Sequence, residues 1–429
     1  MTRCLLLSIL TPLALAQTAA FRAGIARVEI TPAGSMTMYG YGSRKCSSDG
    51  THDPLFAKVL VLEAGSARMA LVTLDLGSIV SDSLRRRVAA ELDIPTVLLA
   101  ASHTHSGPAF LAPAGTAAGL PAISKEPSPY LLEIEQKIFD AIRRAASSLF
   151  PARLGVGRGS LQLGYNRLLL RDDGRARALF DNLQRIPYGP VDPEYVLLRV
   201  DDAEGAPRAL LVHYAAHSVV LGSTNCKYSA DYPGVLQTRV EAAIAGVQCM
   251  FVQGGAGDIN PLFQGRKGVD ADDFAVVETM GRLLADAVVK TAGPLRTAPP
   301  ERPSLSAIGE VIPFAGRWEP GRTLDVGITT VLLNGDIAIA AVPGEPHHRL
   351  QTYWKTHADA PVPLFYGYTY SSGGVWPGYL PDLRTAAYGG YGADVTTSVE
   401  IGAAERIMER HRINLYRLRG MWRDKPGLP

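Results

Sequence analysis

Residues 95–108 read PTVLLAASHTHSGP, and this stretch changes from apolar to polar at a single point. Pro95–Ala101 has the length and aliphatic content of a buried strand. His103 and His105 then follow on a short polar segment. Because ligands gather beyond the carboxyl ends of strands in α/β sheets, this junction is a candidate functional site.

Other short apolar runs along the chain are also predicted as strands. They are Ala57–Leu62, Ala70–Leu74, Val196–Val200, Leu210–His213, Cys249–Val252, Thr329–Leu333, Ile337–Val342 and Leu364–Thr369. Some of these runs lead into loops that carry chemically active side chains, among them His217, Asp258, Glu345 and Tyr379. The pattern therefore predicts a site assembled from several strand ends.

Helical patterns separate some of the strands. Ser128 is predicted to cap a helix with Pro129 at its first position, and apolar residues follow at helical spacing. Similar patterns cover Val235–Ala245, Phe274–Val289 and Val399–Leu415. Strands mixed with helices predict an α/β fold, with mixed β-sheets flanked by helices. The Pro-rich stretch around Glu301–Pro303 is the best candidate for a boundary between lobes.

The composition is that of an ordinary globular protein. The chain has 429 residues, of which 47% are hydrophobic and 20% are charged. Its 43 Lys and Arg residues nearly balance 41 Asp and Glu residues, so the net charge is +2. This balance gives no reason to expect a nucleic-acid or anionic-membrane partner.

The N-terminus has the pattern of a signal peptide. Arg3 precedes the apolar run Cys4–Ala16, and Ala14-Leu15-Ala16 has the small residues of a cleavage site. The run is shorter than the roughly 20 residues that span a bilayer. We expect residues 1–16 to be removed and 17–429 to form a secreted or periplasmic catalytic unit without a transmembrane anchor. A buried N-terminal helix is the alternative.

Three cysteines remain in the expected mature chain: Cys46, Cys226 and Cys249. An odd number allows at most one disulfide within the chain, and the sequence leaves its pairing open.

The histidine and carboxylate loops fit a zinc site. Imidazole and carboxylate ligands suit Zn²⁺, and a catalytic zinc keeps one position open for water. His103 and His105 are two residues apart, so in an extended segment they share a face, and one could bind metal while the other contacts substrate. A lone His217 is more often a core histidine, and Glu345 could be a carboxylate at a helix N-terminus. The prediction therefore rests on the joint pattern; His213, His347 and His348 are not assigned to metal.

Several motifs in this chain resemble those of the neutral/alkaline (non-lysosomal) ceramidase family, which are zinc-dependent amidases that cleave the N-acyl bond of ceramide. SHTHSGP at 102–108 is similar to the family's THTHSGP segment. The resemblance extends from Gly24–Pro32 to Tyr391 and includes YNR at 165–167, GDINP at 257–261 and VPGE at 342–345.

This resemblance implies roles for particular residues. The implied zinc ligands are His103, His217, Glu345 and Tyr379. The residues implied to hydrogen-bond the substrate or the developing oxyanion are His105, Arg167 and Tyr391. Asp231 and Asp258 are read as groups that support the ligands or fix loops. An ion-pairing role for Arg167 and a structural role for the tyrosine-rich loop are the alternatives.

The chain also departs from the family pattern. Asn260 occupies the position of a family serine, which argues against a serine nucleophile but not against zinc-bound hydroxide. The family's C-terminal β-sandwich domain is expected to be absent, so we expect a catalytic-domain-only member.

The resulting hypothesis is an exported zinc-dependent amidohydrolase that cleaves an N-acyl amide, such as a ceramide-like lipid, by attack of zinc-bound hydroxide. A zinc hydrolase acting on another ester, lactone or N-acyl substrate remains open, as does a non-catalytic binding protein that retains the scaffold. A serine hydrolase is disfavoured because the chain has no GxSxG motif. The expected partner is a small-molecule or lipid amide, and the sequence leaves the oligomeric state open.

Overall fold

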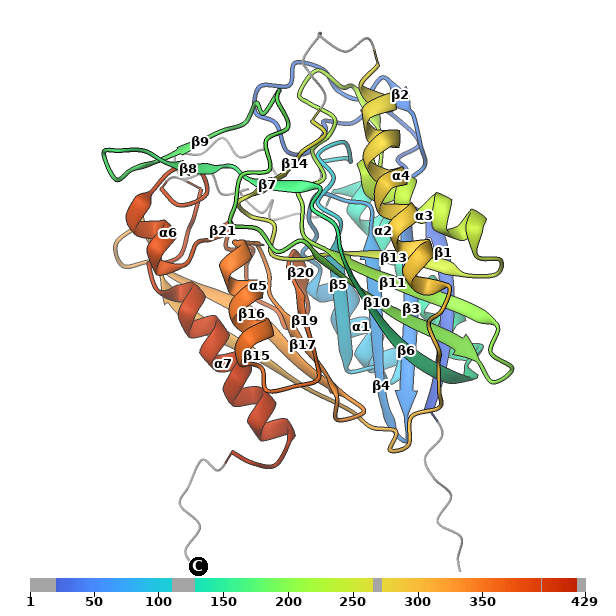
Figure 1. The fold of residues 1–429 in the computed structure, drawn as a ribbon. Coiled ribbons are helices and arrows are strands. Elements are labelled where there is room, and N and C mark those ends of the chain that lie inside the picture. The colour runs from blue at the N-terminus through green and yellow to red at the C-terminus, as the bar shows by residue number, and fades with distance from the viewer. Residues whose placement is uncertain (1–20, 110–127, 265–271, 395, 423–429) are drawn as a thin grey trace, which may run out of the picture.

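The computed structural model describes residues 21–109, 128–264, 272–394 and 396–422. It confirms the predicted α/β class with mixed sheets. Two sheets pack face to face, and helices cover their outer faces, with α4 (Asp273–Ala292) on one side and α5 (His348–His357) and α7 (Ala403–Leu418) on the other (Figure 1). The predicted signal peptide lies outside the described residues.

The larger sheet has nine strands in the order β13-β11-β10-β6-β1-β3-β4-β5-β20. Their bounds are β1 Phe21–Glu29, β3 Phe56–Ala64, β4 Ala67–Leu74, β5 Thr96–Ala101, β6 Phe150–Ser160, β10 Glu194–Asp202, β11 Pro207–Tyr214, β13 Gln248–Gln253 and β20 Thr369–Tyr370. Most neighbours are antiparallel, but β4 pairs with β5 and β11 pairs with β13 in parallel.

The smaller sheet has four strands in the order β15-β16-β17-β19. They are β15 Leu305–Ala315, β16 Thr323–Leu333, β17 Ile337–Ala341 and β19 Val362–Tyr366, and β17 pairs with β19 in parallel. One hydrophobic cluster, which includes Leu98, Ala100, Val331 and Ile339, fills the space between the two sheets. The sheet begins just after Glu301–Pro303, but whether that stretch separates lobes stays a prediction.

Alternation along β5 shows how the layers form. Val97 and Leu99 pack with α1 (Asp82–Leu92) and α2 (Pro129–Ser147), whereas Leu98 and Ala100 face the smaller sheet. Successive side chains of a strand point to opposite faces, so this apolar run is buried on both sides. On the same outer face, α3 (Asp231–Ala243) and α4 cover β11 and β13. The outer face of the smaller sheet packs against α5 and α7.

The helix with the clearest sequence signals forms as predicted. Ser128 caps α2 by accepting a hydrogen bond from the Leu131 amide, and Pro129 is its first residue. The predicted start of another helix at Val399 is wrong, because Gly402 has a φ of 92° and α7 begins at Ala403. The helix predicted from Val235 begins earlier, at Asp231, because proline is tolerated in a first helical turn.

The prediction of one strand over Leu364–Thr369 is also wrong. β19 ends at Tyr366, and β20 begins at Thr369 in the other sheet. Tyr368 between them has a φ of 54°, in the left-handed region that no strand residue adopts. The chain therefore crosses from one sheet to the other at the point where the sequence shows a continuous run.

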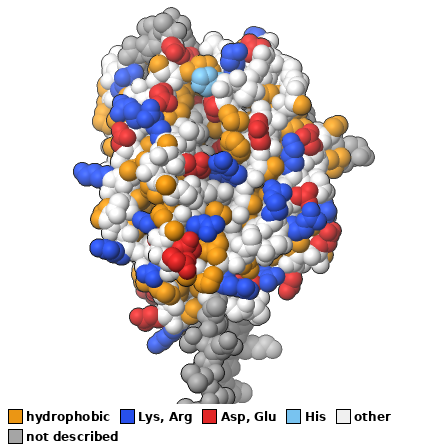
Figure 2. Space-filling view, turned by 90° about the vertical axis from the view of Figure 1, so that its right-hand side faces the viewer, with side chains coloured by type: hydrophobic (Ala, Val, Ile, Leu, Met, Phe, Trp, Pro, Cys, Tyr) orange, Lys and Arg blue, Asp and Glu red, His pale blue; other side chains and the backbone are white. Residues whose placement is uncertain are grey.

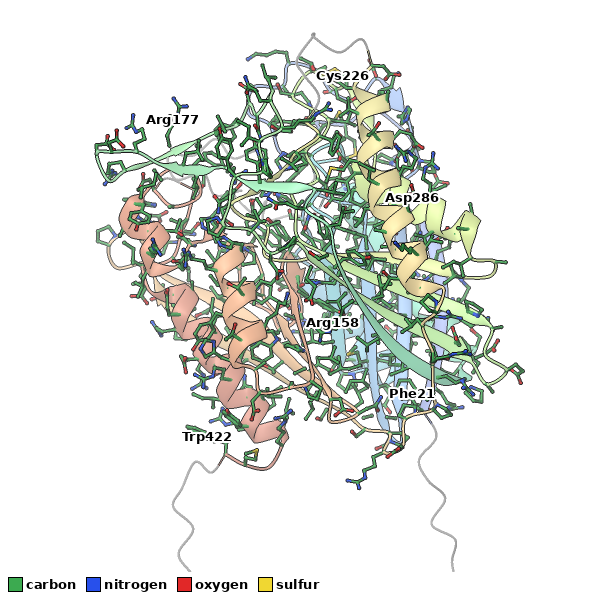
Figure 3. All side chains as sticks on the ribbon, viewed as in Figure 1. Phe21, Arg158, Arg177, Cys226, Asp286 and Trp422 are labelled. Carbon is green, nitrogen blue, oxygen red and sulfur yellow. A yellow bond between two sulfur atoms is a disulfide. The ribbon has the colours of Figure 1, made fainter. Side chains whose placement is uncertain are left out.

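Short strands connect the loops, and most of those labelled in Figure 1 lie toward the upper end of the molecule as drawn there. They are β2 Gly50–Thr51, β7 Gly164–Asn166, β8 Leu168–Leu170, β9 Ala176–Ala178, β12 Lys227–Tyr228, β14 Ile259–Pro261, β18 Glu345–Pro346 and β21 Tyr379–Leu380, and the short helix α6 spans Leu383–Tyr388. Cys226 and Arg177 lie at this end, whereas Phe21 and Trp422 lie at the opposite end (Figure 3). The loops that follow the parallel strands therefore meet far from the described chain ends.

One face of the described surface shows how the charged side chains are distributed. On the face shown in Figure 2, basic and acidic side chains are interspersed rather than gathered by sign. Among the helices of the described ranges, none combines the length and the apolar character that crossing a bilayer requires.

Candidate active site

Three predicted ligands from separate parts of the chain meet at one point. His103 follows β5, His217 follows β11, and Glu345 follows β17. Glu345 Oε2 lies 3.3 Å from Nε2 of His103 and 3.2 Å from Nε2 of His217. All three side chains are nearly or fully buried. The strand-end pattern in the sequence therefore predicted a real convergence of side chains.

Backbone carbonyls orient both of these histidines. Nδ1 of His103 lies 2.7 Å from the Gly77 carbonyl oxygen, and Nδ1 of His217 lies 2.6 Å from that of Ala256. A carbonyl can only accept a hydrogen bond, so each Nδ1 carries the proton. A neutral ring of this tautomer has a free lone pair on Nε2, and the Nε2 atoms of both rings face Glu345. This is the tautomer that a metal ligand needs, and a main-chain group holds it here.

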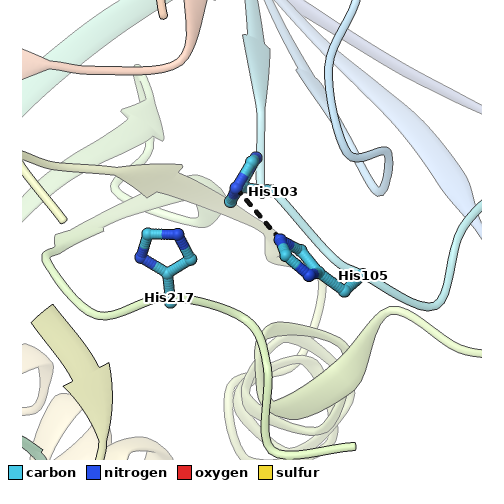
Figure 4. Close-up of side chains that lie close together, drawn as sticks. All are labelled: His103, His105 and His217. Carbon is cyan, nitrogen blue, oxygen red and sulfur yellow. Dashed lines mark hydrogen bonds between the residues drawn. The ribbon is translucent and has the colours of Figure 1, made fainter. Parts of the chain in front are cut away.

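His105 completes a cluster of three imidazoles (Figure 4). Its Nε2 lies 3.2 Å from Nε2 of His103, and ligand atoms of His103, His105 and His217 all lie within 4.8 Å of one another. Nδ1 of His105 is buried without a hydrogen-bond partner among the described residues. His105 therefore keeps one nitrogen available for a ligand or for proton transfer.

Ring nitrogens of His103 and His217 face one carboxylate, that of Glu345. Burial lowers the pKa of His217 to about 4 and holds the pKa of His105 well below its ordinary value. Burial alone would raise the pKa of Glu345, but the contacts with His103 and His217 hold it well below its usual range. With each Nδ1 proton used on a carbonyl oxygen, the Nε2 atoms can face an ionised carboxylate at 3.2–3.3 Å only if a proton or a metal cation lies between them. A divalent cation with nitrogen and oxygen ligands fits this donor set, and Zn²⁺ is such a cation.

Tyr379 lies beside the cluster. Its ring is nearly parallel to that of His217, with centroids 6.4 Å apart. Burial raises the pKa of the Tyr379 phenol well above its ordinary value, so in this structure the phenol is neutral. Its oxygen accepts a hydrogen bond of 3.0 Å from Nη2 of Arg167. Its role as a metal ligand stays a prediction.

Arg167 is buried rather than exposed as a surface arginine. Its guanidinium donates to Oδ1 of Asn260 at 2.9 Å and to the Gly257 carbonyl oxygen. The guanidinium carbon lies 5.2 Å from the ring centroid of Tyr391. Asn260, the residue that replaces the family serine, therefore acts here as an acceptor for the arginine.

A cavity of about 310 Å³ connects these groups to solvent. His105, Arg167, His217, Tyr379 and Tyr391 line it. Apolar side chains, namely Phe180, Val219 and Val220, form other parts of its wall. The predicted substrate-contacting residues thus share one cavity with two of the predicted ligands.

The two aspartates expected to support the site do not touch the histidine ligands. Asp231 accepts hydrogen bonds from the amides of Val220 and Leu221, in the loop after His217. Asp258 pairs with His348, whose Nδ1 lies 2.6 Å from its carboxylate. Both aspartates fix loops, whereas backbone carbonyls orient His103 and His217.

Sequence reasoning missed several aromatic residues of the site. The rings of Tyr39 and Tyr41 contact His105 edge-on, at centroid distances of 5.6 and 4.8 Å. Tyr368 lies 4.4 Å from the His103 ring. The glycine between Tyr39 and Tyr41 was the one sequence signal. Gly40 has a φ of 99°, and a Cβ there would lie 2.2 Å from Cγ of His105, so the close approach requires glycine.

Comparisons with known proteins identify the family of the chain. Residues 21–312 match the family described as neutral/alkaline non-lysosomal ceramidase, N-terminal. The neutral ceramidase of Pseudomonas aeruginosa is 28% identical over 286 residues, which cover 60% of this chain and 39% of that protein. The match thus spans well under half of that relative's length.

Two solved structures share the fold. A neutral ceramidase from Pseudomonas aeruginosa superimposes with a TM-score of 0.76 at 18% identity, covering 96% of this chain and 76% of that chain. A structure described as ceramidase complexed with C2 has a TM-score of 0.76 at 17% identity, covering 96% of this chain and 77% of that chain.

Proposed function

Because the chain belongs to the neutral/alkaline non-lysosomal ceramidase family, we propose that it is a zinc-dependent amidohydrolase that cleaves the N-acyl amide of a ceramide-like lipid. The observation that carries the proposal is the convergence of two carbonyl-oriented imidazoles on one buried carboxylate. His103, His217 and Glu345 would hold the zinc, with Tyr379 as the predicted fourth ligand.

A zinc ion held there would polarise a substrate carbonyl and supply a nucleophile near neutral pH, because it lowers the pKa of a water molecule from 15.7 to about 7. His105 lines the cavity and has a buried Nδ1 without a partner among the described residues, so we assign to it the transfer of a proton to the leaving amine. Such acid–base transfer contributes about 10²–10⁴-fold to rates.

In the proposed mechanism, Arg167 and Tyr391 bind the carbonyl oxygen of the substrate. Both line the cavity, and Arg167 is fixed by its bonds to Asn260 and Tyr379. A fixed donor that faces developing negative charge contributes roughly 3–4 kcal/mol to transition-state stabilisation. In this scheme Asn260 holds Arg167 in place, and the reaction needs no nucleophilic hydroxyl at position 260.

The lining of the cavity suits a lipid-like amide, whereas its volume favours a smaller substrate as a second candidate. Its apolar wall at Phe180, Val219 and Val220 suits an acyl chain, and Phe180 is 43% exposed at the rim. Its volume of about 310 Å³ lies at the small end of the usual range for ligand pockets. This size favours, as the alternative, a shorter N-acyl amide, ester or lactone hydrolysed by the same residues.

We propose in addition that the protein is exported. Cys46 and Cys226 form a disulfide, and structural disulfides belong mainly to secreted and periplasmic proteins. The signal-peptide pattern at residues 1–16 supports the same location.

The deciding experiment assays the purified protein against a panel of ceramides with long and short acyl chains, simple N-acyl amines, esters and lactones. Each assay is run on zinc-loaded protein, after chelation, and after zinc is restored. We expect hydrolysis of an N-acyl amide that chelation removes and zinc restores. Hydrolysis that survives complete metal removal, or a zinc-loaded protein inert toward the whole panel, would overturn the proposal.

A further inference from the structure

A buried ion pair lies next to the candidate active site, between residues that the mechanism does not use. Nδ1 of His348 lies 2.6 Å from Oδ2 of Asp258, and the two side chains are 4% and 2% exposed. Oδ1 of Asp258 also accepts a hydrogen bond of 2.8 Å from the His348 amide. One carboxylate thus holds both the ring and the main chain of the first residue of α5.

The same aspartate holds the segment that carries Arg167, between β7 and β8. Asn166 donates from Nδ2 to Oδ2 of Asp258 at 2.9 Å, and the Arg167 amide donates to the Asp258 carbonyl oxygen at 2.9 Å. The Arg167 guanidinium then bonds Gly257 and Asn260, which flank Asp258 closely in the chain. The loop that contains Asp258 therefore fixes the position of the guanidinium.

Glu345 is tied to the same loop from the other side. The Gly257 amide donates to the Pro346 carbonyl oxygen at 2.8 Å, and α5 begins at His348, shortly after Glu345. The contact between His348 and Asp258 therefore joins the segment of the proposed zinc ligand Glu345 to the segment of the proposed oxyanion donor Arg167.

The pKa shifts of Asp258 and His348 have the directions expected for a charged pair. Burial alone would raise the pKa of Asp258, but His348 and His347 hold it well below its ordinary value. Burial alone would lower the pKa of His348, but Asp258 raises it above its ordinary value. A buried ion pair of this kind does little for net stability, although removing one partner leaves a costly uncompensated charge.

We propose that His348 is a positioning residue for the proposed hydrolysis: through Asp258 it fixes Arg167 and Glu345 relative to one another without touching the substrate. The inference rests on the proposed function, and it assigns a role to a histidine that zinc binding does not use. A residue that supports a metal site from outside typically changes metal affinity or activity by 10–100-fold when it is removed.

The test compares His348→Ala with His348→Asn, because an asparagine amide can still donate to Asp258. Zinc affinity is measured by competition with a chromophoric chelator, and kcat and KM are measured on the best substrate of the panel. We expect His348→Ala to weaken zinc binding about tenfold and to lower kcat by 10–100-fold, with KM changed by less than about threefold. His348→Asn should restore most of both losses, and exposed His357→Ala should match wild type.

A double-mutant cycle separates positioning from simple destabilisation. If His348 acts on turnover through Arg167, His348→Ala should cost little further kcat in an Arg167→Ala background. Equal losses in both backgrounds, failure of His348→Asn to restore zinc affinity, or wild-type zinc affinity in folded His348→Ala would overturn the proposal. If wild-type protein hydrolyses nothing, the proposed function fails, and the zinc competition still decides the role of His348.

Discussion

Glu345 and Tyr379 face each other as register partners in the parallel pair β18–β21, although they lie on different loops. The Glu345 amide also donates to the Gly378 carbonyl oxygen at 2.9 Å. A backbone ladder therefore fixes the spacing between a carboxylate that contacts two histidines and a phenol that contacts Arg167. This pairing explains how two loops far apart in sequence can serve one site.

Replacing Tyr379 tests this arrangement. Tyr379→Phe keeps the ring beside His217 but removes the oxygen that accepts from Arg167. We expect kcat to fall by about 10²-fold, because Arg167 loses one of its three hydrogen-bond partners and the proposed zinc ligand is gone. Zinc competition should show weaker binding. Tyr353→Phe on α5, an exposed phenol bonded to Glu409, is the matched control, and Tyr379→Phe behaving like it would contradict the prediction.

Removing either oriented histidine should abolish the metal site. In His103→Ala or His217→Ala, Glu345 keeps only one imidazole neighbour of the pair, and two strong nitrogen ligands become one. We expect less than about 0.1 zinc per chain by elemental analysis and no measurable hydrolysis. Circular dichroism establishes that the variants are folded, and His357→Ala should retain zinc. Stoichiometric zinc with normal turnover in either variant would refute the assignment.

The disulfide between Cys46 and Cys226 joins two walls of the cavity. Gly40–Ser43 lies shortly before Cys46, and Val219–Ser223 lies shortly before Cys226; residues of both segments line the cavity. Breaking the bond should lower the free energy of unfolding by about 2–5 kcal/mol, because the unfolded chain gains freedom. KM should also rise as the walls loosen.

Reductant provides the measurement and the control for the disulfide. Denaturant unfolding of wild type should shift when reductant is added, whereas the Cys46→Ser/Cys226→Ser variant should unfold at the same denaturant concentration with or without it. Cys249 is buried and free, so it gives no competing disulfide signal. An equal shift in both proteins would show that reductant acts elsewhere.

The parts of the fold that depend on local chemistry could be predicted from the sequence. Ser128 and Pro129 start α2 through a local cap, and the strand before His103 is a continuous apolar run. β6 was missed because its sequence, FPARLGVGRGS, is rich in glycine and only partly buried. It forms because β10 pairs with it along its length, a contact between distant residues that no local pattern encodes.

The same distinction applies to the site. Polar residues at strand ends indicated His103, His217 and Glu345, since parallel strands deliver their carboxyl ends to one edge. The carbonyls of Gly77 and Ala256 that orient the rings carry no side-chain signal, so the sequence suggested only carboxylates, as ligand-supporting or loop-fixing groups. Likewise, the pairing of Cys46 with Cys226 depends on how two loops fold together, which the cysteine count leaves open.

A last prediction concerns pH and a buried carboxylate outside the active site. Asp192 accepts hydrogen bonds from Nζ of Lys355 at 2.6 Å and from Nε2 of Gln351 at 2.7 Å. Burial alone would raise the pKa of Asp192, but these contacts hold it below its ordinary value. A depressed carboxyl pKa stabilises the fold above the unfolded-state value of about 4, and the contribution disappears as pH falls through the folded-state pKa.

Asp192→Asn should therefore lower the free energy of unfolding by about 2 kcal/mol at pH 7, since a hydrogen-bonded charge is lost. The difference from wild type should shrink as pH falls below about 4, because the carboxyl of the unfolded wild-type chain then takes up a proton before that of the folded chain. Urea unfolding across this range measures the effect. Glu319→Gln, in an exposed pair with Arg322, should change stability by less than about 1 kcal/mol at any pH. A difference for Asp192→Asn that is the same at pH 7 and pH 3 would mean that its carboxylate charge contributes nothing to the fold.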